Sequence, residues 1–372
     1  MDFSLSDEQR AIQETFRSFA ERELKPAARE LDEAPRFPRE LFEKLGRMGF
    51  FGMRYPEPEG SGADLLSYLL GIEEIARGSL SVAAAATMQS LMGTYFVNKF
   101  AEGELRQRLF VPALAGEKVG TICMTEPNAG SDLFSMRTRA EERDGSWYIS
   151  GQKTWITSAP VADFFTVFAR TGEKSLSIFL VEKGAAGLEV GRAIDKMGVK
   201  ASLTSEVAFD ECQATCMLGE RDKGTSYLRE ILAEVRLVTA ALALGVGRAA
   251  YEEAIAYAGE RQQFGKPISK FQAIQLHLAD MAVELEAARH FIEWAAWRSE
   301  QGLPNDNQAS MAKLHASEAA NKVCDLAARV LASYGFANDY PVQRFLRDAR
   351  FTLIGGGTSE ILRVNIGKSV AG

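Results

Sequence analysis

The run FFTVFARTGEKSLSIFLVE at residues 164–182 decides the fold class of the middle of this chain. It holds two apolar, β-branched segments, 164–169 and 176–182, separated by a polar Gly-containing turn, which is typical of antiparallel strands. Similar short runs lie on both sides of it: VGTICM (119–124), WYIS (147–150), TWIT (154–157), LEV (188–190) and EVAF (206–209). The middle third is therefore predicted to be an antiparallel β domain.

The residues before this region follow a helical pattern. Ser6 and Gln9 have the spacing of a capping box, and Ile12, Phe16 and Phe19 then recur at intervals of four and three. Further apolar stripes with the same spacing continue to about residue 112. The first third is predicted to be a helical domain.

After Lys223 the helical period returns and persists to the end of the chain. Apolar positions at three-and-four spacing run through 225–262, 268–301 and 307–333. Helices of this length bury their apolar faces by packing on one another. Helices, then strands, then long helices indicate an α+β protein with segregated domains: residues 1–112 helical, 113–223 β, and 224–372 a four-helix-type bundle.

Composition excludes several classes of function. Lys and Arg number 43 against 50 Asp and Glu, for a net charge of −7, so nucleic-acid binding is not expected. Four cysteines and three histidines, widely scattered, predict neither a disulfide framework nor a metal site. The charged N-terminus does not resemble a signal peptide, and no stretch approaches the length of a membrane span. A cytoplasmic protein without membrane attachment is expected.

The loop sequence MTEPNAGSD (124–132) follows the first predicted strand and places polar, turn-forming residues where they can face a ligand. Together with four later motifs in order, it resembles the flavin-dependent acyl-CoA dehydrogenase family. Those motifs are GQKTWIT (151–157), RQQFGKPI (261–268) with Phe271-Gln272, Tyr340-Pro341 with Arg347-Asp348-Ala349, and GTSEI (357–361). The resemblance covers nearly the whole chain and implies the family's three-domain fold.

The resemblance implies an FAD between the β domain and the C-terminal bundle. Met124 and Thr125 would face the pyrimidine side and reactive edge of the flavin, Trp155 would lie against the ring, and Thr157 would bond near N5. Thr358 and Glu360 match cofactor-side positions. An aromatic face and fixed donors hold and tune a flavin without adding chemistry of their own.

Other cofactor contacts are implied to come from a neighbouring subunit. Arg261, Phe264 and Gln272 resemble residues that reach the pyrophosphate and adenosine of the partner's FAD, so at least a dimer, and commonly a homotetramer, is expected. Arg329 stands where the family usually has Gln, and an Arg can also meet a pyrophosphate. Ser131 and Arg236 match positions that receive the acyl-CoA thioester.

The chain departs from the family at the catalytic base. Family members remove a proton beside the thioester with a Glu either immediately before Gly-Thr-Ser or just before the Arg matching Arg236. Here those positions hold Gly356 and Val235. The backbone N–H of Gly356 can still polarise the thioester oxygen as an oxyanion donor. Glu234 is a candidate base, although one helical step turns it by about 100° from the usual position. The stretch 87–90 is another candidate source of the acid/base group.

Three functions remain open on the sequence. The first is an FAD-dependent dehydrogenase, or an enoyl-CoA reductase, acting on the α,β carbons of an acyl-CoA with a non-standard acid/base group. An oxidative reaction would pass electrons to an electron-transfer flavoprotein. The second is another acyl-CoA chemistry on this fold, desulfination or 1,4-oxidation of a cyclic enoyl-CoA. The third is a non-catalytic acyl-CoA-binding protein.

Overall fold

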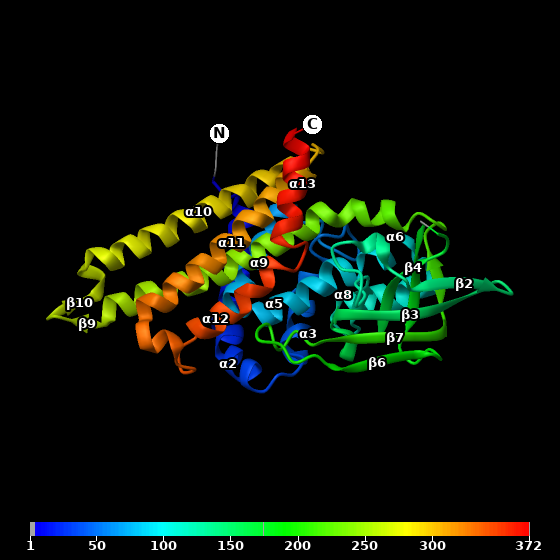
Figure 1. Ribbon diagram of the computed structural model, residues 1–372, viewed down its shortest axis with the longest axis horizontal. Coiled ribbons are helices and arrows are strands. Elements are labelled where there is room, and N and C mark those ends of the chain that lie inside the picture. The colour runs from blue at the N-terminus through cyan, green and yellow to red at the C-terminus, as the bar shows by residue number, and fades with distance from the viewer. Residues whose placement is uncertain (1–3, 174, 372) are drawn as a thin grey trace.

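The computed structural model describes residues 4–173 and 175–371, which form three regions along one long axis (Figure 1). The helices of the first region are α1 (Asp7–Phe19), α2 (Lys25–Glu33), α3 (Arg39–Arg47), α4 (Leu65–Gly78), α5 (Leu80–Thr87), α6 (Tyr95–Phe100), α7 (Gly103–Leu105) and α8 (Val111–Leu114), with the short turns η1 (Ala20–Leu24), η2 (Phe50–Gly52), η3 (Met88–Gly93) and η4 (Arg106–Phe110) between them. The predicted capping box is confirmed, since Ser6 Oγ accepts the Gln9 N–H at 3.1 Å and Gln9 Oε1 accepts the Ser6 N–H at 3.0 Å.

The middle region is an eight-stranded sheet in the order β6-β7-β3-β2-β4-β5-β8, with β1 beside β4. Its strands are β1 (Gly120–Cys123), β2 (Arg139–Arg143), β3 (Ser146–Thr157), β4 (Phe164–Arg170), β5 (Leu176–Glu182), β6 (Leu188–Ala193), β7 (Thr204–Gln213) and β8 (Cys216–Leu218). Short 3₁₀ turns, η5 (Leu133–Ser135) and η6 (Ala159–Val161), lie in its connections.

The predicted antiparallel arrangement holds for most strand pairs but needs one correction. Strand β1 pairs with β4 in parallel, and β2 meets β4 in parallel at one residue pair. A tight turn can join only antiparallel neighbours, whereas β1 reaches β4 through the whole β2–β3 hairpin, and so long a connection permits parallel pairing.

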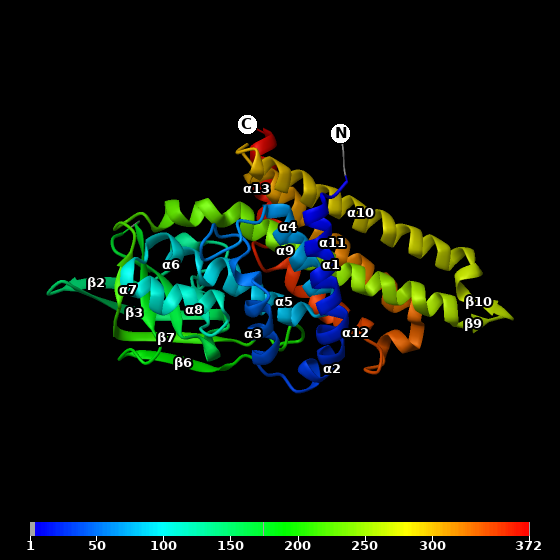
Figure 2. The same cartoon turned by 180° about the vertical axis from the view of Figure 1, so that it is seen from behind.

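The third region contains α9 (Gly224–Glu260), α10 (Gln272–Glu300), α11 (Asp306–Leu331), α12 (Val342–Ala349) and α13 (Ser359–Ala371), with the hairpin β9 (Gln262–Gln263) and β10 (Lys266–Pro267) and the turns η7 (Ile268–Lys270), η8 (Ala332–Phe336) and η9 (Arg350–Leu353). Helix α9 starts beside the sheet and extends to the β9–β10 hairpin at the opposite end of the molecule (Figure 1). Figure 2, from behind, shows α4 packed along the middle of α9, with α1 on the other side of α4. At Gly245 a Cβ would lie 2.4 Å from the Glu73 carbonyl oxygen, so glycine permits the close approach of α9 and α4.

One described segment, Leu80–Phe100, is long and apolar enough to cross a membrane, with a mean hydropathy of 1.2 over its most apolar window. The prediction that no stretch approaches the length of a membrane span is therefore wrong for this segment. Because 83% of that window is buried inside the fold, the segment is a core helix that packs under the sheet and α9.

Candidate active site

A buried ion pair between Lys153 and Glu126 holds the loop that carries Met124 and Thr125. Lys153 Nζ donates to Glu126 Oε1 at 2.9 Å and to the Met124 carbonyl at 3.0 Å. The Glu126 carboxylate also accepts the backbone N–H groups of Arg137 and Thr138. Burial alone would raise the pKa of Glu126, but these donors and Lys153 outweigh it and hold that pKa below its ordinary value.

Strand β3 brings Trp155 and Thr157 to the same place. The Thr154 N–H donates to the Thr125 carbonyl at 2.9 Å, which ties the strand to the loop. The pairing of β3 with β7 shifts between Lys153 and Ile156, and within this bulge Trp155 has a φ of +59°. A bulge re-aims side chains, and the Trp155 ring is left 57% exposed despite its apolar surface.

These residues suit a flavin. An indole that the fold leaves uncovered offers a face for a planar ring. Close by, the hydroxyl of Ser158 is buried without a hydrogen-bond partner among the described residues. The resemblance implies that Met124, Thr125 and the Thr157 hydroxyl supply polar groups to the flavin. The structure therefore brings Met124, Thr125, Trp155 and Thr157 together as the resemblance implied.

The loop 355–358, between η9 and α13, packs against the middle of α9. Gly356 has a φ of +69°, and a Cβ there would lie 2.5 Å from Thr239 Oγ1. The Thr239 hydroxyl donates to the Val235 carbonyl at 2.9 Å. Gly356 and Val235, the two positions at which the resemblance implies a catalytic Glu, thus both lie beside Thr239, and neither is a carboxylate.

Glu234 is held by an arginine. Arg54 Nε lies 2.5 Å from Glu234 Oε1, and the other guanidinium arm contacts Oε2. The pair is mostly buried, and the Arg54 guanidinium lies between the rings of Tyr55 and Tyr95, at 5.2 and 5.5 Å from their centroids. Burial lowers the pKa of Arg54, but Glu234 outweighs that effect and raises it above its usual value. Glu234 as a base stays a prediction that this bidentate pairing disfavours.

The stretch 87–90 uses its side chains within the fold. Thr87 bonds the Ala84 carbonyl, Ser90 bonds Tyr68 at 2.5 Å, and Gln89 bonds the carbonyls of Ala113 and Lys118. These groups are structural partners, so the geometry does not favour the stretch as the source of the acid/base group.

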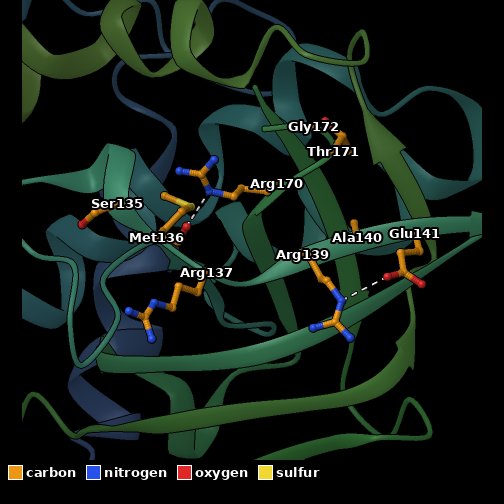
Figure 3. A pocket seen from close by; sticks show the side chains of 9 residues that line it. All are labelled: Ser135, Met136, Arg137, Arg139, Ala140, Glu141, Arg170, Thr171 and Gly172. Atoms are coloured by element: carbon orange, nitrogen blue, oxygen red, sulfur yellow. Dashed lines mark hydrogen bonds and ion pairs between the residues drawn. The ribbon is translucent and has the colours of Figure 1, made fainter. Parts of the chain in front are cut away.

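The two residues expected to receive the thioester lie on different elements. Arg236, on α9, is largely buried and bonds the Asp306 carbonyl at 3.3 Å. Ser131 is exposed in the loop before η5. Beyond that loop, a groove of about 510 Å³ runs over β2 and the end of β4, as Figure 3 shows. Arg170 shapes its floor by donating to the Met136 carbonyl at 2.6 Å.

The remaining cofactor-side residues lie at two other places. Thr358 Oγ1 accepts the Ile361 N–H at the start of α13, and Glu360 is exposed in the first turn of that helix. Arg261 and Phe264 lie at the β9–β10 hairpin, at the far end of the long helices from β3 (Figure 1). Phe264 is 93% exposed, and Gln272 begins α10 beside it.

Arg329 lies near the end of α11 and pairs with Asp325 at 2.7 Å, with most of its side chain in solvent. The β9–β10 hairpin lies at the opposite end of the molecule from β3, which carries Trp155 (Figure 1). The implied role of Arg261, Phe264 and Gln272 toward a second subunit stays a prediction.

Sequence reasoning missed several residues that shape the candidate site: Lys153, which holds the loop at Met124 and Thr125, Arg54 on Glu234, Thr239 against Gly356, and Lys313 on the Gly357 carbonyl. Lys153 lies inside the GQKTWIT motif, so its presence there was a usable signal. The other three carry no local pattern, because their partners lie far away in the sequence.

Comparison with known proteins covers all three regions. Family models match the N-terminal domain of acyl-CoA dehydrogenases at residues 6–117, the middle domain at 121–212 and the C-terminal domain at 222–371. The chain is 59% identical to benzylmalonyl-CoA dehydrogenase of Aromatoleum aromaticum over the full length of both. It is 38% identical to a short-chain-specific acyl-CoA dehydrogenase of Clostridium acetobutylicum, with 98% of each chain covered.

A solved structure agrees with these sequence matches. Butyryl-CoA dehydrogenase from Megasphaera elsdenii superposes with a TM-score of 0.95 at 34% identity, covering all of both chains. The predicted helical, β and helical domains are those of this fold. The chain therefore belongs to the acyl-CoA dehydrogenase family and is an FAD-dependent oxidoreductase of acyl-CoA thioesters.

Proposed function

We propose that this enzyme dehydrogenates the α,β carbons of an acyl-CoA whose α carbon bears a second carboxyl group, with an aryl group beyond the β carbon. The observation that carries the proposal is the absence of a carboxylate at both 356 and 235, where the backbone of loop 355–358 packs directly on Thr239. The 59% identity to an enzyme named for benzylmalonyl-CoA supports the same substrate class.

An α-carboxyl substituent on the substrate would explain why this chain lacks the Glu. It would occupy the space beside the α hydrogen in which the family places its catalytic carboxylate. The substrate carboxylate and a Glu carboxylate in the same space would repel each other strongly. Glycine at 356 removes the repulsion.

The chain's own groups then have these roles. The Gly356 N–H donates to the thioester oxygen and stabilises the negative charge that develops when the α proton leaves. That proton passes to a non-standard acceptor, for which a solvent water molecule is our choice. Met124, Thr125, Trp155 and Thr157 hold the flavin, while Ser131 and Arg236 hold the thioester. Bound FAD would accept the β hydrogen as hydride, leaving an α,β double bond in the product.

The experiment compares matched thioesters with the purified holoenzyme under anaerobic conditions. Benzylmalonyl-CoA should bleach the flavin and yield a product two hydrogens lighter by mass spectrometry. 3-Phenylpropanoyl-CoA, which lacks only the carboxyl group, and butyryl-CoA should react much more slowly. Equal or faster bleaching by 3-phenylpropanoyl-CoA would contradict a role for the carboxyl group.

We also propose a homotetramer in which Arg261, Phe264 and Gln272 complete the FAD site of a neighbouring subunit. Exposed large apolar side chains support this assembly, since Phe264 is 93% and Val283 69% exposed. We further propose that electrons leave through an electron-transfer flavoprotein in the cytoplasm.

A further inference from the structure

Lys313 on α11 is a fully buried lysine with an unusual partner. Its Nζ donates to the Gly357 carbonyl at 2.6 Å, and the residue has no exposed surface. Burying an ammonium is costly unless strong acceptors compensate. No carboxylate lies within salt-bridge distance of it in the described part of the chain, so a main-chain carbonyl of the 355–358 loop is its recorded partner.

The loop that Lys313 holds has a backbone conformation that residues with a side chain rarely adopt. Gly356 and Gly357 have φ values of +69° and +104°, and a Cβ at Gly355 would lie 2.7 Å from the Phe351 ring. A chain of glycines has many accessible conformations, so the glycines alone do not select this one. Something outside the loop must fix it.

Helix α11 supplies that support at two points. Lys313 and Asn321 lie eight residues apart on one face of the helix. Asn321 Nδ2 donates to the Ala349 carbonyl at 3.0 Å, at the end of α12, and Lys313 reaches Gly357 at the other end of the segment. Between them lies Ser317, whose buried hydroxyl has no partner among the described residues. Lys313 and Asn321 therefore hold the two ends of segment 349–357 on α11 by hydrogen bonds, and Lys313 holds the end next to Gly356.

We propose that Lys313 is a positioning residue for the oxyanion: by holding the Gly357 carbonyl it directs the Gly356 N–H at the thioester oxygen. The inference rests on the oxyanion role of Gly356 in the proposed function. A charge-assisted hydrogen bond is about twice as strong as a neutral one, which suits a contact that must hold a flexible glycine loop. The positive charge of Lys313 is bound to Gly357, the residue after Gly356, whose N–H would face the negative charge that develops on the thioester oxygen.

The test uses a ligand that enolises but is not oxidised. Acetoacetyl-CoA is titrated into the holoenzyme, and the long-wavelength charge-transfer absorbance of its enolate with the flavin is recorded. Its affinity is compared by calorimetry with that of S-butyl-CoA, a thioether without the carbonyl oxygen. The variants are Lys313→Met and, as the matched control, Asn321→Leu, which removes the hydrogen bond at the other end of the segment.

Lys313→Met should lose most of the absorbance and bind acetoacetyl-CoA at least tenfold more weakly, with S-butyl-CoA affinity within twofold of wild type. Asn321→Leu should lower the melting temperature but retain the absorbance. If Lys313→Met keeps the absorbance and the affinity ratio, the lysine is only structural and the inference is wrong. If the wild type itself forms no such band, the oxyanion role of Gly356 in the proposed function fails instead.

A measurement on the wild type covers the case in which Lys313→Met does not fold. Burial lowers the pKa of Lys313 to about 8, and Glu318 and Glu360, the charged groups that face it, oppose the shift. The band should therefore weaken as pH rises past about 8, although ionisation of the ligand by itself would strengthen it. A band that only strengthens over this range overturns the inference.

Discussion

Replacing Gly356 with Glu restores the family's usual carboxylate at a position that the structure has closed to side chains. The left-handed conformation costs a non-glycine residue about 1–2 kcal/mol. The new Cβ would also lie 2.5 Å from Thr239 Oγ1 and 3.2 Å from its Cβ. Overpacking of this kind costs about 1–3 kcal/mol, so Gly356→Glu should lower the free energy of unfolding by about 2–5 kcal/mol.

The packing part of that cost should be recoverable. Thr239→Ala removes the oxygen and methyl group that face position 356 and leaves only the contact with the Thr239 Cβ. Chemical denaturation of the FAD-saturated wild type, both single variants and the double variant gives the coupling between the two sites. A favourable coupling of about 1–3 kcal/mol is expected in the double variant.

The double variant is also the test of the missing base. A positioned general base contributes about 10²–10⁴-fold, so the rate of flavin bleaching by butyryl-CoA should rise in that range over wild type. Turnover of benzylmalonyl-CoA should fall, because two carboxylates would then compete for one space. Val235→Glu is the independent version of the same change. Additive stabilities and an ordinary wild-type rate with butyryl-CoA would together refute the reasoning.

Further expectations concern the cofactor, the assembly and pH. Trp155→Ala should weaken FAD binding by about 1–3 kcal/mol in equilibrium dialysis, and unchanged affinity would show that the ring does not touch the flavin. Phe264→Asp should shift light scattering toward smaller species with lower FAD content, whereas an FAD-saturated wild-type monomer would contradict assembly across that hairpin. Burial raises the pKa of Asp348 to about 6, and the Val199 N–H at 2.5 Å and Arg344 oppose the shift. Since this folded pKa lies above the unfolded value, the contribution of Asp348 to stability is greatest below about pH 4 and is lost as pH rises through 6. Unfolding free energies of wild type should decline over that range relative to Asp348→Asn, and parallel profiles would rule the effect out.

The sequence by itself determined the order of the three regions, and the boundaries chosen at 112 and 223 stay predictions. Apolar periodicity is a local property of the chain, so the helix expected over 225–262 is found as Gly224–Glu260. The same holds for the Ser6–Gln9 capping box, whose partners are three residues apart. The motifs also placed the residues proposed to hold the flavin on β3 and its neighbouring loop, because each motif is contiguous.

Tertiary structure alone decided which polar groups far apart in the sequence meet. Glu234 and Arg54 are 180 residues apart, and nothing in either local pattern indicates that they pair. Lys313 reads in the sequence as an ordinary helix residue, yet packing of α11 against loop 355–358 buries it on a carbonyl 44 residues away. The exposure of Trp155 likewise depends on a register shift between two strands. Such contacts are set by the packing of distant elements and by the hydrogen bonds that buried polar groups require, which no short stretch of sequence contains.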